Sequence, residues 1–189
     1  MSETPSHQHP TTAPSVRLAL PSEAGAVAAL QRRAWQRDPV LSSVAGEVDL
    51  ETSTAAWERA ILAPPMAHFR VLVAVQPAHD DPRRQIVCGF SAFGPSDDPD
   101  ADDDDILVAE FAIDPPAEGL GHDGRLLNAV ADTARADGYH RLTWWLASTD
   151  DRLRAWLVET GWAPDGAHRE VATDDDGLRL KQVRLHTGL

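Results

Sequence analysis

Cysteine is almost absent from this chain, which has one, Cys88, among 189 residues. A single cysteine cannot form a disulfide within the chain, and it excludes a metal site built from four thiolates. This scarcity indicates a reducing compartment, so we expect a cytoplasmic protein. Basic residues are also scarce, because 17 Lys and Arg stand against 30 Asp and Glu, a formal net charge of −13. Since binding to a phosphate backbone needs a basic surface, this balance argues against direct binding of nucleic acid.

Long apolar runs are missing as well. Stretches such as VLVAV at 71–75 and ILVA at 106–109 fall far short of the roughly 20 residues needed to cross a bilayer. We therefore expect no membrane span. The segment MSETPSHQHPTTAPS at the start lacks the basic and apolar regions of a secretory signal. We predict a disordered tail over 1–14 and a single domain over 15–189.

The acidic residues are unevenly distributed. The acidic run, DDPDADDDD at 97–105, contains seven aspartates in nine positions and accounts for much of the net charge. Such a run repels itself, so it is expected to be a mobile, solvated loop that cannot pack. A second interpretation is that the clustered carboxylates attract a cationic substrate or a divalent ion.

Hydrophobic periodicity predicts the order β-α-α-β-β-β-α-β-α-β-β. Alternating or β-branched runs predict strands, and apolar residues at a spacing of three to four predict helices. This order predicts an α/β fold of the mixed α+β kind, with a mixed central sheet and helices on both faces. The expected strands are 15–20, 69–75, 86–93, 106–114, 140–148, 168–172 and 178–185, and the expected helices are 22–35, 49–62, 125–137 and 150–160.

A glycine-bearing loop separates the strand over 106–114 from the following helix. Gly119, Gly121 and Gly124 give its backbone freedom, and Arg125 adds a cation. Unpaired amides at the start of a helix, together with the helix dipole, favour binding of a phosphate. The spacing also matches GxGxxG of dinucleotide-binding folds, but the surrounding elements disfavour that alternative. Histidines show no HExxH or paired spacing, so we expect no metal site.

Two segments resemble the GNAT acyltransferases, in particular small single-domain members from bacteria. IDPPAEGLGHDGRLL at 113–127 is similar to the acetyl-CoA-binding motif V-x-P-x-x-[QR]-x-x-G-x-[GA]. DDRLRAWLVETGW at 150–162 is similar to the segment N-x-x-A-x-x-[LF]-Y-x-x-x-G-[FW]. With the element order, the resemblance covers residues 16–187.

The resemblance implies acetyl-CoA as a co-substrate. The backbone of the strand would pair with the pantetheine arm, and amides of the loop would hold the pyrophosphate. The residues implied in cofactor binding are Ala112, Ile113, Glu118, Gly119, Leu120, Gly121, His122, Asp123, Gly124, Arg125 and Asp150.

Several positions depart from the family pattern. Glu118 replaces Gln or Arg, Asp123 replaces a small residue, and Asp150 replaces Asn. These carboxylates would lie near a polyanionic cofactor, and Asp123 would be tolerated if its side chain turned outward to cap the helix. Leu157 stands where the family usually has the tyrosine that protonates the leaving thiolate.

Three residues are candidates for catalysis. Glu110 lies on the central strand between apolar residues, where burial raises the pKa of a carboxyl, so it is a candidate general base. A salt-bridged or exposed strand residue is the alternative interpretation. Ser148 and Thr149, at the end of the strand over 140–148, are candidate donors to the leaving sulfur. Proximity supplies much of the acceleration in such a transfer, so a missing acid slows it without preventing it.

The resemblance implies an N-acetyltransferase that transfers an acetyl group directly to a primary amine in a ternary complex. The acidic run favours a cationic small molecule or peptide as the partner. The alternative is a weakly active or inactive acyl-CoA-binding module with a regulatory or interaction role, which Glu118, Asp123 and Leu157 support. The oligomeric state stays open, and a homodimer is one alternative.

Overall fold

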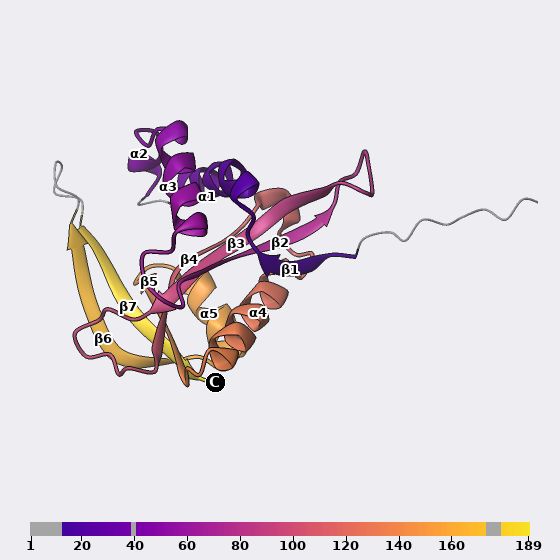
Figure 1. Ribbon diagram of the computed structural model, residues 1–189. Helices are drawn as coiled ribbons and strands as arrows, with labels where there is room; N and C mark the ends of the chain where they lie inside the picture. The colour runs from indigo at the N-terminus through magenta and orange to yellow at the C-terminus, as the bar shows by residue number, and fades with distance from the viewer. Residues whose placement is uncertain (1–12, 39–40, 173–178) are drawn as a thin grey trace, which may run out of the picture.

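The computed structural model describes residues 13–38, 41–172 and 179–189, and Figure 1 shows the arrangement of its elements. Within these residues, strands form one mixed sheet in the order β1-β2-β3-β4-β5-β7-β6. Neighbouring strands are antiparallel except β4 and β5, which are parallel. The strands are β1 Ser15–Leu18, β2 Arg70–Pro77, β3 Gln85–Pro95, β4 Asp105–Ile113, β5 Arg141–Ala147, β6 Ala163–Ala172 and β7 Arg179–Gly188.

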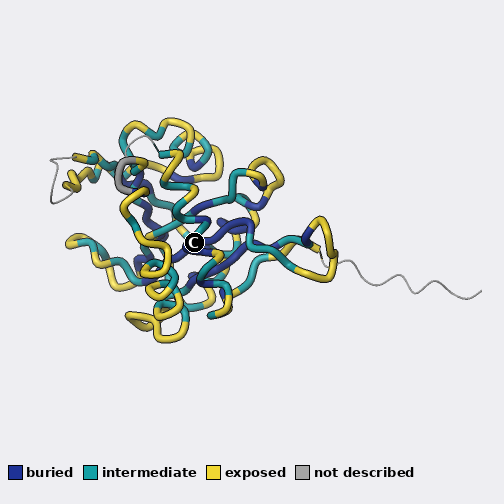
Figure 2. The backbone as a smooth tube through the Cα atoms, turned by 90° about the horizontal axis from the view of Figure 1, so that it is seen from above, coloured by how far each residue is buried: buried dark blue, intermediate teal, exposed yellow. Residues whose placement is uncertain are grey.

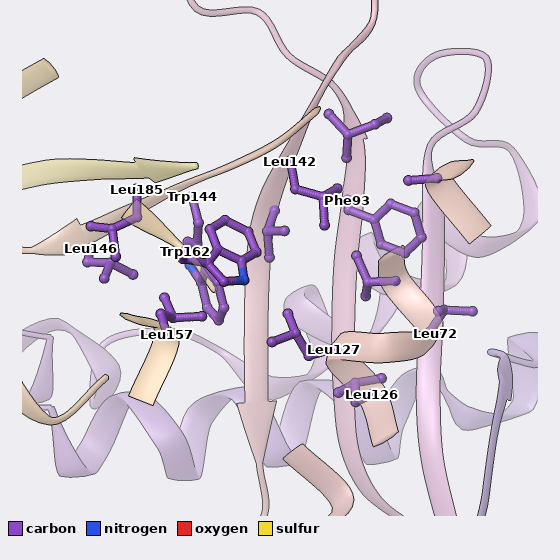
Figure 3. Close-up of a cluster of buried hydrophobic side chains, with 14 residues drawn as sticks. Leu72, Phe93, Leu126, Leu127, Leu142, Trp144, Leu146, Leu157, Trp162 and Leu185 are labelled. Atoms are coloured by element: carbon purple, nitrogen blue, oxygen red, sulfur yellow. The ribbon is translucent and has the colours of Figure 1, made fainter. Parts of the chain in front are cut away.

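Helices cover both faces of the sheet. The helices are α1 Ala24–Arg37, α2 Ser42–Ala45, α3 Leu50–Leu62, α4 His122–Ala136 and α5 Asp151–Glu159. On one face, Val27 and Leu30 of α1 and Trp57 of α3 pack on alternate residues of β2 and β3. On the other face, α4 packs mainly on β1, β2 and β3. Leu157 of α5 joins the same core beside Trp144 of β5 (Figure 3). Figure 2 shows the resulting buried stretches in the middle of the molecule.

The predicted mixed sheet with helices on both faces is confirmed. Two details differ from the prediction. The last hairpin is longer, because β6 begins at Ala163 and pairs with β7 on both sides of an irregularity between Pro164 and His168. The short helix α2 was not predicted. Residues 1–12 of the predicted tail and all of the predicted turn TDDDG, at 173–177, lie outside the described residues. In the described part of the chain, no helix is both long enough and apolar enough to span a membrane.

Strand β4 contains a one-residue β-bulge at Ala109. On β3, Ala92 pairs with Glu110 and the adjacent Phe93 pairs with Val108, so Ala109 has no partner. A bulge shifts the alternation of side chains along a strand by one residue. Before it, Val108 faces the α4 and α5 side, and after it Phe111 faces that side instead. The bulge therefore directs Glu110 toward the face that α1 and α3 cover.

The acidic run packs against the sheet, so the prediction that it cannot pack is wrong for at least three of its aspartates. The side chain of Arg184 on β7 is 4% exposed and binds three carboxylates. Its Nε lies 2.7 Å from Asp165, its Nη1 3.1 Å from Asp98 and its Nη2 2.6 Å from Asp100. Asp105, at the start of β4, is buried and binds Arg141 at 3.1 Å.

Trp145 on β5 completes this cluster. Its indole N–H donates to both carboxylate oxygens of Asp98, at 2.9 and 3.1 Å. The guanidinium groups of Arg169 and Arg184 lie 4.3 and 5.3 Å from the centroid of its ring, a favourable cation–π geometry. We call Asp98, Asp100, Trp145, Asp165 and Arg184 the Arg184 cluster. It holds the loop between β3 and β4 beside β6 and β7, as Figure 1 shows.

We expect Arg184→Met to destabilise the protein by about 3 kcal/mol, because removal of one partner from a buried ion-pair network leaves the others uncompensated. Methionine keeps the unbranched stem of the side chain, so the packing of the stem is largely retained. The matched control is Arg135→Met, which removes an exposed ion pair with Asp132 on α4 and should cost less than about 1 kcal/mol. Urea unfolding of both variants measures the difference. Equal, small losses would show that the cluster contributes no more than a surface ion pair.

Candidate functional site

A cleft opens where β4 and β5 diverge. The two strands pair only from Asp105 and Arg141 to Val108 and Trp144. Beyond this point, the edge of β4 that faces β5 has no strand partner within the described residues. A cavity of about 370 Å³ lies there, and its lining residues are Phe111, Ile113, Glu118, Gly119, Asp123, Asp150, Arg152, Leu153 and Trp156.

The glycine loop, residues 118–124, forms the polar end of this cleft. Gly119 and Gly121 have positive φ angles of 77° and 75°, a conformation that costs little only for glycine. Gly121 is the residue directly before α4, whose first residue is His122. In the described part of the chain, no group accepts a hydrogen bond from the amides of Gly119, Gly121, His122 and Asp123. These free amides and the helix dipole make a favourable environment for an anion.

Three carboxylates at the cleft are engaged locally. Glu118 lies 3.1 Å from Arg37 of α1 and 3.8 Å from Arg152 of α5. Asp150 caps α5 by accepting the amide of Leu153 at 2.9 Å. Asp123 accepts the amide of Gly124 at 2.9 Å. Asp123 therefore binds the first turn of α4, as expected of a cap, but its side chain lines the cleft instead of turning outward.

The side chains of His122, Arg125 and Leu120 do not line the cleft. The side chain of His122 is buried, and its Nε2 lies 2.8 Å from Gln76 on β2, so only its amide faces the loop. Burial, and to a lesser extent the charge of Arg125, lowers the pKa of His122. The Nη1 of Arg125 donates to the carbonyl of Leu120 at 3.2 Å, which supports the loop. The side chain of Leu120 is exposed.

Glu110 lies on the opposite face of β4, in a network with α1 and α3. Gln31 donates to its Oε1 at 3.0 Å, and the indole of Trp57 in turn donates to Gln31 at 2.9 Å. The side chain of Trp35 on α1 also acts on the carboxylate and lowers its pKa. Burial raises the pKa of Glu110 to about 7, although the hydrogen bonds from Gln31 and Trp35 act in the opposite direction. A carboxyl with this pKa can accept a proton near neutral pH.

The bulge is supported from β3. The hydroxyl of Ser91, which is buried, donates to the carbonyl of Glu110 at 3.0 Å. Ala112 of β4 pairs with Phe90 of β3, and its side chain is buried in the core on the α1 and α3 side. Of the two predicted β4 residues, only Ile113 therefore lines the cleft.

The candidate proton donors lie at the end of β5. Ser148 is partly exposed and its amide donates to Lys181 on β7 at 2.8 Å. Thr149 is exposed, and neither side chain lines the cleft, although the next residue, Asp150, does. Leu157 is completely buried among the side chains of the α4 and α5 side. It presents no polar group where the family has its tyrosine.

Two groups of site residues escaped the sequence analysis. Gln31 and Trp35, which act on the carboxylate of Glu110, are four residues apart on α1. The glutamine beside the apolar stripe of this helix was the sequence feature that could have indicated them. Leu153 and Trp156 line the cleft but belong to a helix whose apolar residues indicated core packing. Arg152 adds a cation to the cleft from the first turn of that helix.

Comparison with known proteins finds similarity in structure. No protein-family model matches the sequence, and no curated protein matches it. The yncA protein of Salmonella typhimurium, solved with acetyl-CoA as its cofactor, is 19% identical, with a TM-score of 0.68 over 94% of this chain and 95% of that one. A ribosomal-protein-alanine N-acetyltransferase from Brucella melitensis is 20% identical, with a TM-score of 0.68 over 92% and 99% of the two chains.

A third similar structure is an acetyltransferase of the GNAT family from Streptococcus pneumoniae. It is 14% identical, with a TM-score of 0.66 over 93% of this chain and 99% of that one. Each similarity covers nearly the whole of both chains. The chain therefore has the fold of the GNAT acetyltransferases.

Proposed function

We propose that this protein is an N-acetyltransferase that transfers an acetyl group from acetyl-CoA to a primary amine in a ternary complex. The observation that carries the proposal is the arrangement of β4. One face of this strand lines a cleft that ends in free amides at the start of α4. The other face holds Glu110, whose pKa is raised to about 7. The candidate base thus lies on β4, the strand that leads into the anion-binding loop.

The cleft residues fit the chemistry of coenzyme A. The unpaired amides of Gly119, Gly121, His122 and Asp123 suit a pyrophosphate, and the positive φ of Gly121 leaves them accessible. The apolar side chains Phe111, Ile113, Leu153 and Trp156 suit the pantetheine arm, and the free edge of β4 suits its amides. The acetyl thioester of acetyl-CoA would supply the acyl group. The structure of the Salmonella protein with acetyl-CoA supports this choice of co-substrate.

Glu110 would take the proton from the ammonium group of the acceptor. Its Oε1 is fixed by Gln31, which Trp57 fixes in turn, so the carboxylate has a defined direction. Because its pKa is about 7, roughly half of the carboxyl groups are ionised at neutral pH and ready to accept a proton. Leu157 has no proton to donate to the leaving thiolate. Ser148 and Thr149, next to Asp150 of the cleft, are the hydroxyl candidates for that step.

The acceptor that we propose is a cationic small molecule or peptide. Trp145 faces away from the Trp144 side of β5, so the loop bound to it lies on the same sheet face as Glu110. The Arg184 cluster holds this loop in place, and Asp102 and Asp103 are exposed on it. Exposed carboxylates on this loop would favour approach of an acceptor with more than one positive charge. The single, buried Cys88 supports a cytoplasmic location.

We expect acetyl-CoA to raise the melting temperature of the protein and a primary amine to trigger release of free thiol. The matched pair Gly121→Ala and Gly124→Ala tests the loop. Alanine at position 121 is strained at φ 75°, whereas Gly124 has helical backbone and open space around it. Gly121→Ala should weaken binding of acetyl-CoA about tenfold, from a cost of about 1.4 kcal/mol, and Gly124→Ala should leave it unchanged. Binding measured by calorimetry without thiol release from any amine would indicate an acyl-CoA-binding module instead of an enzyme.

Glu110→Gln should lower kcat about 100-fold and leave the affinity for acetyl-CoA unchanged, because it removes the base alone. Only the ionised carboxylate accepts a proton, so the rate of the wild-type enzyme should rise with pH through about 7 and level off above it. The rate of the variant should lack this inflection.

The same variant has an internal check on folding. A carboxyl whose pKa is raised in the folded state contributes stability below its unfolded pKa and loses it as pH rises through 7. The neutral glutamine should therefore not lower stability at pH 8. A wild-type pH profile without an inflection near 7 would remove Glu110 as the base.

The double substitution Asp102→Asn with Asp103→Asn should raise KM for a polyamine roughly threefold at low salt and leave KM for a singly charged amine unchanged. Asp80→Asn with Asp81→Asn is the control, because it makes the same change of charge in the turn between β2 and β3. Steady-state kinetics at low and high salt measure both pairs. Equal effects from the two pairs would show that net charge matters and that the position of the loop does not.

A further inference from the structure

The inner end of the cleft is closed by two aromatic rings. Phe111 is the residue of β4 that lines the cleft closest to the point where β4 and β5 separate. Trp156 extends from α5, one turn beyond Arg152 at the polar end. The ring centroids of Phe111 and Trp156 are 6.1 Å apart, within the usual range for an aromatic pair. We call these two residues the aromatic wall.

The aromatic wall rests on a well-packed core. Phe111 contacts Trp144 with a centroid distance of 5.1 Å, and Trp144 contacts Trp162 at 6.0 Å. Trp144, Trp162 and Leu157 are all buried, and Figure 3 shows them close together. Because protein interiors are close-packed, Phe111 cannot move inward without displacing these side chains. A group that enters the cleft therefore cannot displace Phe111 from its position.

The wall stands at the level of the candidate base. Phe111 directly follows Glu110 in sequence, and the bulge at Ala109 places their side chains on opposite faces of β4. A thioester carbonyl that an amine beside Glu110 attacks must lie at this level of the strand. The carbon chain attached to that carbonyl then extends toward the aromatic wall.

We propose that Phe111 and Trp156 restrict the acyl group to acetyl, with Trp156 as the main determinant of chain length. This inference rests on the proposed function, because it assigns the acyl specificity of the same cleft. One methylene more than an apolar pocket can hold reduces kcat/KM by roughly tenfold or more. Trp156 is partly exposed, unlike Trp144 and Trp162, so its replacement enlarges the cleft without opening the core.

The test compares acetyl-CoA, butyryl-CoA and hexanoyl-CoA with wild-type protein, Trp156→Ala and Trp156→Leu. The wild-type protein should prefer acetyl-CoA over hexanoyl-CoA at least about 100-fold in kcat/KM. Trp156→Ala should reduce this preference to about tenfold or less, mainly by improving the use of hexanoyl-CoA. Trp156→Leu, which keeps an apolar side chain of intermediate size, should fall between the two. Calorimetric Kd values for the same three thioesters give a second measure that does not depend on turnover.

Leu153→Ala is the matched control, because Leu153 lines the cleft one helical turn closer to its polar end. It should weaken all three thioesters equally and leave their order unchanged. Equal use of the three thioesters by the wild-type protein, or an unchanged preference in both Trp156 variants, would overturn the inference while the proposed function stands. Failure of all three to bind wild-type protein would instead overturn the proposed function, and the inference with it.

Discussion

The bulge at Ala109 is the constraint on which the site depends. If the same residues formed a regular strand without the bulge, Glu110 would share a face with Val108 and point among the apolar side chains under α4 and α5. With it, the carboxyl reaches Gln31 on α1 while Phe111 turns to the cleft. Bulges often redirect one side chain next to an active site, and here the same bulge redirects two. The hydroxyl of Ser91 fixes the irregularity by donating to the Glu110 carbonyl, so the core of β3 supports the geometry of the site.

The proposed site has a second requirement, a free strand edge beside the start of α4. The separation of the parallel strands β4 and β5 provides this edge. Four residue pairs join these strands before they separate. In the proposed reaction, the separation admits the co-substrate from the α4 and α5 side, and the acceptor approaches from the α1 and α3 side. The Arg184 cluster then has a role beyond stability, because it holds the acidic run on the acceptor face instead of leaving it in solvent. In this proposal, the same buried arginine contributes to the stability of the fold and to the preference for a cationic acceptor.

Sequence patterns predicted the elements well but missed the contacts that assemble the site. Periodicity identified the strands, the glycine loop and the helix after it, because local backbone preferences determine these features. The bulge left no such mark, since AEF at 109–111 resembles an ordinary alternating strand. The packing of the acidic run was also missed, because Arg184 follows Asp98 and Asp100 by more than 80 residues. A run of aspartates indicates solvent exposure when read alone. Gln31 and Trp35 escaped for the same reason, since only the folded chain places α1 over Glu110.

Acidity at the cleft is less of an obstacle to an anionic ligand than the sequence indicated. Arg37 and Arg152 both bind Glu118, so two cations offset the charge of this carboxylate, and Arg152 itself lines the cleft. Asp150 is engaged as a helix cap. Asp123 is different, because its carboxylate occupies the amide of Gly124 and lines the cleft with no cation bound to it in the described part of the chain. Since the amides of Gly119, Gly121 and His122 stay free, the electrostatic cost to a pyrophosphate falls on one residue, and replacement of Asp123 alone would relieve it.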